Sequence, residues 1–310
     1  MDLPKDLNLT LKKYKDLRYG ENPHQQAAFC VDGSKSPGFE KLWGIDLSYN
    51  NLDDAYGAWK LVSDFNTSTV AIIKHGNPSG IASRENPLEA FNLAFEADQV
   101  SAYGGIVATN VSPTIETIEA MSGKFFELMI APGYSKEVLT RLEKRSAKMR
   151  VIRADLPKDD FEIKRIFNGF LVQTPDTVQG SKSKWKVVSG SRPSAKVYED
   201  LEMAWKVVKH VKSNAIVVVS DLVMVGMGTG QPNRVNSVKL ALSQAGKRVR
   251  GAVLASDAFF PFEDSVDLAA ASGISTIIQP GGSINDERVI ADAKKHGIVM
   301  IFTGVRHFKH

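Results

Sequence analysis

An internal repeat is the feature that most constrains what this chain of 310 residues can fold into. Residues 52–73 and 198–219 share one pattern, an amphipathic helix followed directly by a short apolar β-run, and the two segments align without a gap. The best-matching block pairs Ala58–Val62 with Ala204–Val208, 146 residues further along the chain. Elements of the same type in the same order indicate that one structural unit occurs twice.

More blocks keep the order of the repeat at nearly the same offset. They are Gly105–Val107 with Gly251–Val253 at 146 residues, Ile130–Gly133 with Ile278–Gly281 at 148, and Val151–Ile152 with Val299–Met300 at 148. Helices alternate with short apolar strands in both halves, which predicts a layered α/β fold. We expect one subdomain at residues 1–193, with an N-terminal arm and a connecting segment that holds a strand at Phe170–Gln173. The second subdomain is expected at residues 194–310.

Composition excludes several classes of protein. The one cysteine, Cys30, excludes an internal disulfide framework, multi-cysteine zinc sites and iron–sulfur clusters. No apolar stretch approaches the roughly 20 residues of a membrane helix, and the N-terminus lacks the pattern of a signal peptide. The net charge is only +4, and we interpret its densest basic stretch, Leu142–Arg150, as the solvated face of a helix. A cytoplasmic protein that binds neither nucleic acid nor membrane is expected.

Polar groups where apolar strands end are the candidates for chemistry, because ligands of α/β sheets bind at the carboxyl ends of strands. The β-run at residues 69–73 ends in Lys74 and His75, followed by a glycine-containing turn. A neutral imidazole beside an ammonium group suits general base catalysis with stabilisation of negative charge. A surface lysine and a histidine that caps a loop are the alternative, and this pair by itself does not decide between them.

Three other segments have features of ligand sites. The glycines of Val225–Arg234 favour close approach of backbone to a ligand, but their spacing matches neither a dinucleotide fingerprint nor a Walker loop. Ala102–Gly105 precedes a predicted strand. The aromatic residues of Asp257–Asp264 suit either stacking on a flat ring or packing in the core.

The two ends of the chain are also rich in candidate ligand-binding side chains. Arg18, in a polar and turn-rich segment, suits bidentate pairing with a phosphate. A tail of Arg, His and Phe, Gly304–His310, follows directly on a strand. Either segment alone is equally consistent with surface electrostatics.

Taken in order, these motifs resemble a known family. The segments are Arg18–Gln25 (RYGENPHQ), Lys74–Gly80 (KHGNPSG), Ser101–Gly105 (SAYGG), Ile130–Tyr134 (IAPGY), Gly228–Arg234 (GTGQPNR), Ser256–Phe262 (SDAFFPF) and Arg306–His310 (RHFKH). They resemble the AICAR transformylase domain of the bifunctional purine biosynthesis proteins over nearly the whole chain.

The resemblance implies a duplicated, three-layer α/β fold of two cytidine-deaminase-like subdomains. It does not carry over the deaminase metal, because one cysteine cannot supply the Pro-Cys-x-x-Cys ligands of that zinc site. No transition metal is therefore expected. The family's IMP cyclohydrolase domain is expected to be absent here, and the chain is short between Arg234 and Phe259, where larger members carry an insertion.

The resemblance also implies a reaction, the transfer of a formyl group from 10-formyltetrahydrofolate to the 5-amino group of AICAR. Its products are FAICAR and tetrahydrofolate, and a homodimer with active sites between subunits is expected. The alternatives are a formyltransferase with another formyl donor and a non-catalytic protein that binds AICAR.

The residues that match the family's functional positions fall into three groups. The catalytic group is Lys74, His75 and Asn214; the AICAR-binding group is Arg18, Tyr19, Gly104, Glu127, Arg234, Phe259 and Arg306; and Asp264 and His310 lie on the folate side or near the site.

Overall fold

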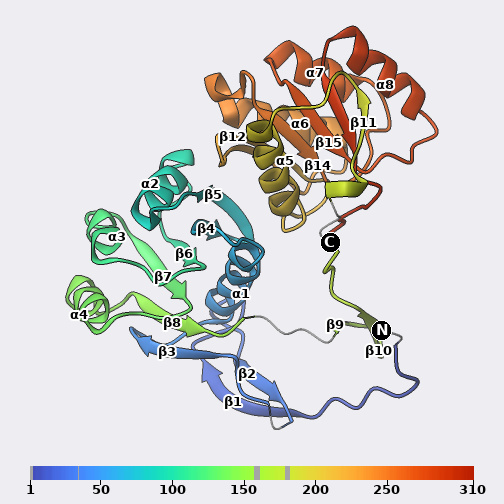
Figure 1. The fold of residues 1–310 in the computed structure, drawn as a ribbon. Coiled ribbons are helices and arrows are strands. Elements are labelled where there is room, and N and C mark those ends of the chain that lie inside the picture. The colour runs from blue at the N-terminus through green and yellow to red at the C-terminus, as the bar shows by residue number, and fades with distance from the viewer. Residues whose placement is uncertain (1–2, 34, 157–160, 179–181) are drawn as a thin grey trace.

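The computed structural model describes residues 3–33, 35–156, 161–178 and 182–310, which form one long mixed sheet with helices on both faces and two separate hairpins (Figure 1). The first half of the sheet layer contains β3 (Phe39–Trp43), α1 (Tyr49–Ser63), β4 (Thr69–Lys74), β5 (Asn77–Ser83), α2 (Pro87–Ala97), β6 (Gly105–Thr109), α3 (Ile115–Ala120), β7 (Phe126–Ala131), α4 (Lys136–Arg145) and β8 (Arg150–Ala154). The second half contains β11 (Lys186–Ser189), α5 (Ala195–Val208), β12 (Ile216–Ser220), β13 (Val223–Gly228), α6 (Arg234–Ala245), β14 (Val253–Ser256), α7 (Asp264–Ser272), β15 (Thr276–Gln279), α8 (Asp286–Lys295) and β16 (Val299–Phe302). The hairpins are β1 (Leu11–Leu17) with β2 (Ala27–Asp32) and β9 (Glu162–Ile166) with β10 (Gly169–Gln173), and two short 3₁₀ turns lie at Lys182–Lys184 and Gly246–Val249.

The strand order of the 12-stranded sheet confirms the duplication. It runs β11-β16-β15-β14-β12-β13 and then, in mirrored order, β5-β4-β6-β7-β8-β3. Each half therefore has the same topology, and the halves join where β13 pairs antiparallel with β5 at Val223 and Ala82. The mixed α/β class is confirmed, and the strand expected at Phe170–Gln173 is found within β10. The subdomain boundary between residues 193 and 194 stays a proposal.

The hydrophobic core forms two layers, one on each face of the sheet. Along β4 the side chains alternate, so that Val70 and Ile72 pack on one face while Ala71 and Ile73 pack on the other. The first face is covered by α2, α3, α4, α6, α7 and α8, and the second by α1 and α5. The expected three-layer arrangement is therefore present.

The structure corrects the interpretation of two glycine-rich segments, because Asn77–Gly80 lies in β5 and Val225–Gly228 lies in β13, while residues 229–233 form the loop before α6. A Cβ atom at Gly80 would lie 1.9 Å from the carbonyl oxygen of Ala94 in α2, and one at Gly226 would lie 2.1 Å from that of Ala241 in α6. A Cβ at Gly228 would lie 1.9 Å from the carbonyl oxygen of Ser237. The lack of a side chain at these three glycines allows a helix backbone to pack directly against the strand, and does not indicate a ligand site.

The sheet registers also correct two blocks of the repeat. Val70 and Ile216 are equivalent, and they pair with Thr109 and Ser256, which are 147 residues apart. The offset expected there was 146 residues. Met129 and Ile277 then pair with Val151 and Met300, so the offset at the last strand is 149 rather than 148. Single-residue insertions between elements account for this increase in the offset. The short matching blocks in the sequence did not show where these insertions lie.

Asp64 and His210 occupy equivalent positions in the two halves and contact each other, with Oδ2 and Nε2 2.6 Å apart. Lys209 Nζ lies 2.7 Å from the same oxygen. Burial lowers the pKa of His210 to about 4, against the hydrogen bond to Asp64, which raises it. Burial would raise the pKa of Asp64, but the hydrogen bonds from His210 and Lys209 outweigh it and lower that pKa to about 2. The halves are thus joined by polar contacts as well as by the sheet.

We expect Gly226→Ala to destabilise the fold by about 1–3 kcal/mol or more, because the new methyl group collides with the α6 backbone. Urea unfolding measures this change. Gly57→Ala is the matched control: Gly57 lies within α1 and a Cβ there meets nothing within 4 Å, so it should stabilise by about 0.5–1 kcal/mol. Equal stability of the two variants would contradict the packing role of Gly226.

The His210 contact predicts a loss of stability in mild acid. Between pH 6.5 and 4 the unfolded chain binds a proton on His210 that the folded chain does not, so the free energy of unfolding falls as the pH falls. The slope is at most about 1.4 kcal/mol per pH unit for this group. His210→Gln should reduce the slope over that range, as measured by urea unfolding at several pH values. An unchanged slope would refute the assignment.

Candidate active site

One edge of the sheet carries most of the predicted site residues, because the two halves run in opposite directions there. Antiparallel pairing of β5 with β13 places the carboxyl end of β4 at the same edge as the amino end of β12. Lys74 and His75 therefore come to the edge that also carries Asn214. The carboxyl ends of β4, β14, β15 and β16 lie at this edge, as expected for a ligand site of an α/β sheet. Gly104 and Glu127 differ, because they lie at the amino ends of β6 and β7.

The turn that follows β4 presents His75 to solvent. Lys74 Nζ donates to the carbonyl oxygen of Tyr103 at 2.7 Å, which draws the Ala102–Gly105 segment to the turn. His75 has φ 53° and Gly76 has φ 73°, so the backbone turns through the left-handed region at both positions. The Asp54 carboxylate in α1 accepts the Gly76 N–H at 2.6 Å.

A side-chain network links this turn to the second half. Thr229 Oγ1 donates to Asn77 Oδ1 at 3.1 Å and is also 2.9 Å from the carbonyl oxygen of Lys212. Lys212 is two residues before Asn214. Hydrogen bonds of Thr229 therefore connect the turn that carries Lys74 and His75 with the segment that carries Asn214.

Asn214 is fixed on both sides of its amide group. Its Nδ2 donates to the carbonyl oxygens of Gln231 at 2.8 Å and Pro232 at 3.2 Å, and its Oδ1 accepts from Arg234 at 2.7 Å. Arg234 is buried, and its guanidinium also donates to Ser256 and forms an ion pair with the fully buried Asp257. These contacts favour a role for Arg234 in positioning Asn214, and its predicted contact with AICAR stays a prediction.

The C-terminal tail packs against the same network. The His307 N–H donates to the carbonyl oxygen of Asp257 at 3.0 Å, and its ring Nδ1 lies 2.6 Å from Asp176. The Ser213 N–H donates to the carbonyl oxygen of Lys309 at 2.9 Å. Burial lowers the pKa of Lys309, as do the nearby charges of Lys60 and Lys212. Arg306 and His310, before and after these anchored residues, are exposed.

Glu127 belongs to a second polar group on the first half. Its Oε2 accepts from Asn51 Nδ2 at 2.8 Å and lies 3.4 Å from Arg150 Nη1. Arg150 is only 5% exposed, so the interpretation of Leu142–Arg150 as a wholly solvated face is wrong at this residue. Burial lowers the pKa of Arg150, Glu127 raises it, and the charge of Arg18 lowers it further.

The remaining predicted residues have simpler surroundings. The Arg18 guanidinium lies 5.3 Å from the centroid of the Tyr19 ring, and the Gly104 N–H donates to the carbonyl oxygen of Phe125 at 2.8 Å. Phe259 is 37% exposed, so it is not a core residue, although its neighbour Phe260 is fully buried. Asp264 is exposed at the start of α7 and accepts from the Ser265 hydroxyl.

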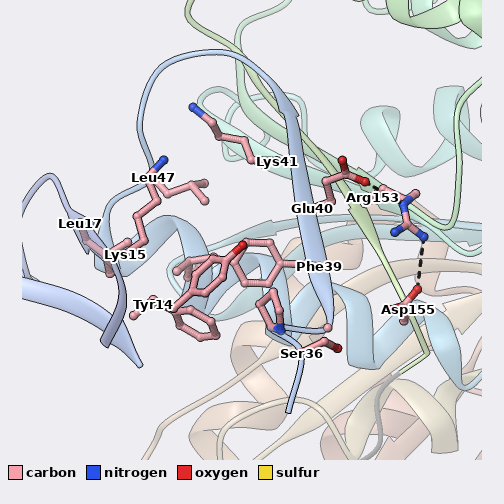
Figure 2. A pocket seen from close by; sticks show the side chains of 14 residues that line it. Tyr14, Lys15, Leu17, Ser36, Phe39, Glu40, Lys41, Leu47, Arg153 and Asp155 are labelled. Atoms are coloured by element: carbon pink, nitrogen blue, oxygen red, sulfur yellow. Dashed lines mark hydrogen bonds and ion pairs between the residues drawn. The ribbon is translucent and has the colours of Figure 1, made fainter. Parts of the chain in front are cut away.

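Two cavities of the single chain lie away from the Lys74 turn. One of about 490 Å³ lies between the N-terminal arm and β3, where Tyr14 and Phe39 each pack against Phe29 beside the Glu40–Arg153–Asp155 ion pairs (Figure 2). The other, of about 990 Å³, is lined by α1, the two residues that follow α5, the β9–β10 hairpin and the tail, and holds His310 alone among the predicted site residues. Neither cavity is lined by Lys74, His75 or Asn214; His75 is exposed, and the other two are partly buried.

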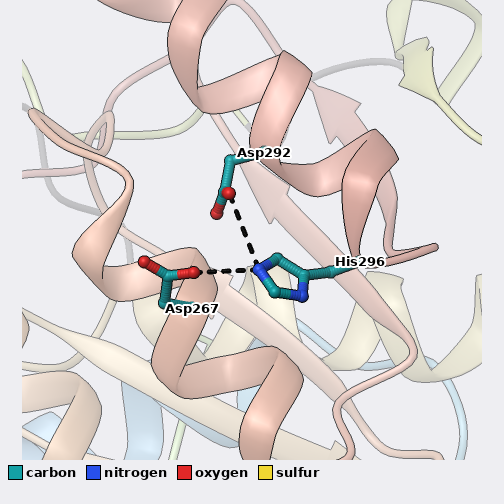
Figure 3. A group of neighbouring side chains, drawn as sticks. All are labelled: Asp267, Asp292 and His296. Atoms are coloured by element: carbon teal, nitrogen blue, oxygen red, sulfur yellow. Dashed lines mark hydrogen bonds and ion pairs between the residues drawn. The ribbon is translucent and has the colours of Figure 1, made fainter.

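One group of side chains has the spacing of a cation site. Asp267, Asp292 and His296 converge between α7 and α8, with His296 Nε2 2.8 Å from Asp267 and 3.6 Å from Asp292 (Figure 3). Lys295 Nζ also lies 3.4 Å from Asp292. His296 and Lys295 thus contact the two carboxylates directly, while Asp292 Oδ2 is buried without a hydrogen-bond partner.

Sequence reasoning missed Asp54, Arg150 and Asp257 as parts of the site. Asp54 carried a signal, because the repeat places Asp200 at the equivalent position. Asp257 lay in a motif singled out for its aromatic residues. Nothing in the sequence distinguished Arg150 from the exposed basic residues beside it, since only the sheet register places it beside Glu127.

Comparison with known proteins gives consistent matches. A family model described as the AICARFT/IMPCHase bienzyme matches residues 1–244. The chain is 47% identical over 315 residues to the bifunctional purine biosynthesis protein PurH of Cyanothece sp., covering 100% of this chain and 61% of that protein. It is 46% identical to PurH of Halalkalibacterium halodurans, over 99% of this chain and 61% of the relative, and 49% identical to PurH of Trichodesmium erythraeum, over 97% and 59%. Thus the chain spans about three-fifths of the length of these relatives.

Among solved structures, RibD of Acinetobacter baumannii (form 2) matches with a TM-score of 0.25 and 17% sequence identity, over 34% of each chain. Among the described residues, no helix is both long enough and apolar enough to cross a membrane.

The Arg234–Asp257 pair predicts a large effect on stability. Asp257→Asn leaves a buried guanidinium without its counter-charge, which should lower the free energy of unfolding by about 3–5 kcal/mol. Asp16→Asn, which breaks the exposed ion pair of Asp16 with Lys13, should change it by less than about 1 kcal/mol. Urea unfolding compares the two, and similar losses would show that burial of the first pair is unimportant.

Proposed function

Because the chain belongs to the AICARFT/IMPCHase bienzyme family, we propose that it transfers a formyl group from 10-formyltetrahydrofolate to the 5-amino group of AICAR. The products are FAICAR and tetrahydrofolate, so that the chain acts in purine biosynthesis. The observation that carries the proposal is the convergence of Lys74 and His75 from one half with Asn214 from the other at one edge of the sheet. We retain the predicted cytoplasmic location.

The amine of AICAR is a weak nucleophile, because its lone pair is delocalised into the carboxamide-bearing ring. In the proposed step the amine nitrogen forms a bond to the formyl carbon and the bond from that carbon to N10 of the folate breaks. A proton leaves the amine and a proton reaches N10. His75, exposed on its turn, takes the proton from the amine, and Lys74 stabilises the charge on the formyl oxygen or the leaving nitrogen.

Asn214 suits a role beside the reacting groups, because both ends of its amide are held and its backbone is anchored to α6 through Ser237. Because this side chain is already ordered, it loses no further conformational freedom when it contacts the reacting groups in the transition state. Its hydrogen bonds to Arg234 and to the Gln231 carbonyl set the direction in which the amide faces.

The nucleotide is proposed to lie across the two polar groups of this edge. Arg18 and Arg306 are exposed and suit the phosphate, with Tyr19 and Gly104 beside it. Glu127 suits the ribose hydroxyls and is held in place by Asn51 and Arg150. Phe259 offers an exposed aromatic face to AICAR, while Asp264 and His310 are assigned to the folate side.

A homodimer with the site between subunits is part of the proposal. It is supported by the exposure of His75, which neither of the two cavities encloses. Exposed apolar side chains on the two hairpins also support it, among them Leu11, Phe167 and Phe170, which are 60, 96 and 60% exposed.

A direct assay tests the function. The purified chain is mixed with AICAR and 10-formyltetrahydrofolate, tetrahydrofolate is followed by absorbance and FAICAR is identified by mass spectrometry. We expect turnover, with a fall of about 10²- to 10⁴-fold in kcat for His75→Ala and little change in AICAR binding. Arg18→Ala should instead weaken AICAR binding by about 1.5–3 kcal/mol, the contribution of a charged hydrogen bond.

The outcomes separate the alternatives. Full turnover by His75→Ala would refute the general base. AICAR binding by calorimetry without any turnover would indicate a non-catalytic protein or another formyl donor, and a formyl phosphate in place of the folate distinguishes these two.

A further inference from the structure

The two halves contain the same hairpin turn, held by the same device. In the first half, Asp54 of α1 accepts the Gly76 N–H at 2.6 Å, and the neighbouring His75 N–H helps to lower the pKa of that carboxyl. In the second half, Asp200 of α5 accepts the N–H groups of Asp221 at 3.0 Å and Leu222 at 2.6 Å. Both aspartates lie 146 residues apart in sequence, as do the turns they hold.

The backbone of both turns needs such support. His75, Asp221 and Leu222 have φ values of 53°, 53° and 55°, in a region that side chains other than glycine seldom occupy. A carboxylate that accepts N–H groups of the turn offsets this strain and fixes the direction in which the first turn residue faces. Burial raises the pKa of Asp54, whereas these backbone hydrogen bonds lower it, as expected for a carboxylate enclosed by its donors.

The turns differ in what they carry. Asp221 is bound by Arg84 and Lys196, each at 2.8 Å, on the edge of the sheet that lacks the predicted catalytic residues. His75 instead follows Lys74 on the edge that carries Asn214. Both turns have the same conformation, and an aspartate supports each of them. Only the turn of the first half carries a predicted catalytic residue.

We infer that Asp54 is a positioning residue for His75: it fixes the turn so that the imidazole meets the amine of the nucleotide. This inference rests on the proposed function and adds to it a residue on α1 that contacts the turn backbone rather than the substrate.

The second half supplies the matched control. Asp54→Asn and Asp200→Asn each replace one carboxylate oxygen by an amide group that cannot accept an N–H, in equivalent hairpins. Both should lower the free energy of unfolding to a similar extent in urea. We expect Asp54→Asn to lower kcat about 10- to 100-fold with the KM for AICAR within about threefold of the wild type, and Asp200→Asn to change kcat by less than about twofold.

Amide hydrogen exchange gives a readout that does not depend on turnover. The Gly76 amide should exchange faster in Asp54→Asn only, and the Leu222 amide faster in Asp200→Asn only. If Asp54→Asn does not fold, Asp54→Ser, which keeps one acceptor oxygen, takes its place in every measurement.

The results distinguish the two levels of the proposal. If the wild type is active and Asp54→Asn has a normal kcat, the positioning role is overturned and the proposed function stays intact. The same conclusion follows if kcat falls as much in Asp200→Asn as in Asp54→Asn. Absence of turnover in the wild type overturns the proposed function, and with it a role of Asp54 in that reaction.

Discussion

The antiparallel contact between β5 and β13 is the constraint on which the rest of the structure depends. It joins two copies of one α/β unit into a single sheet and reverses the direction of one copy relative to the other. Opposite ends of equivalent strands therefore share an edge. A parallel join would have placed Lys74 and Asn214 at opposite edges, so the geometry of the candidate site follows from how the duplicated units meet.

Duplication also explains why one edge differs from the other. Equivalent positions hold His75 and Asp221 at the two turns, and Ser68 and Asn214 before the equivalent strands β4 and β12. The second-half turn is bound in ion pairs, and Arg84 also pairs with Glu89 there. The scaffold, including the aspartate beneath each turn, is kept at both edges, because the turn backbone needs an acceptor whatever side chain it carries. Chemistry was free to diverge once the scaffold was held by these contacts.

The candidate site also shows how buried charge is used to hold exposed groups. Asp257 and Arg234 are buried and neutralise each other, and through Arg234 they orient Asn214. Arg150 is buried behind Glu127 in the same manner. In each pair an interior ionic contact costs desolvation, and the residue at the surface gains a fixed direction. Asn214 and Glu127 are partly exposed, and in the proposed function they meet the ligand together with Arg18, Arg306 and Phe259.

The sequence by itself determined the α/β class, the duplication, the strand at Phe170–Gln173 and the residues that belong to the resembled family, because periodicity and short motifs are local properties of the chain. It did not determine that the glycines of β5 and β13 admit helices, since that depends on the approach of α2 and α6. Nor did it determine the one-residue drifts of the repeat or the roles of Arg150 and Asp257. Sheet register and burial are set by contacts between distant segments, and only the tertiary structure decided which polar side chains those contacts brought together.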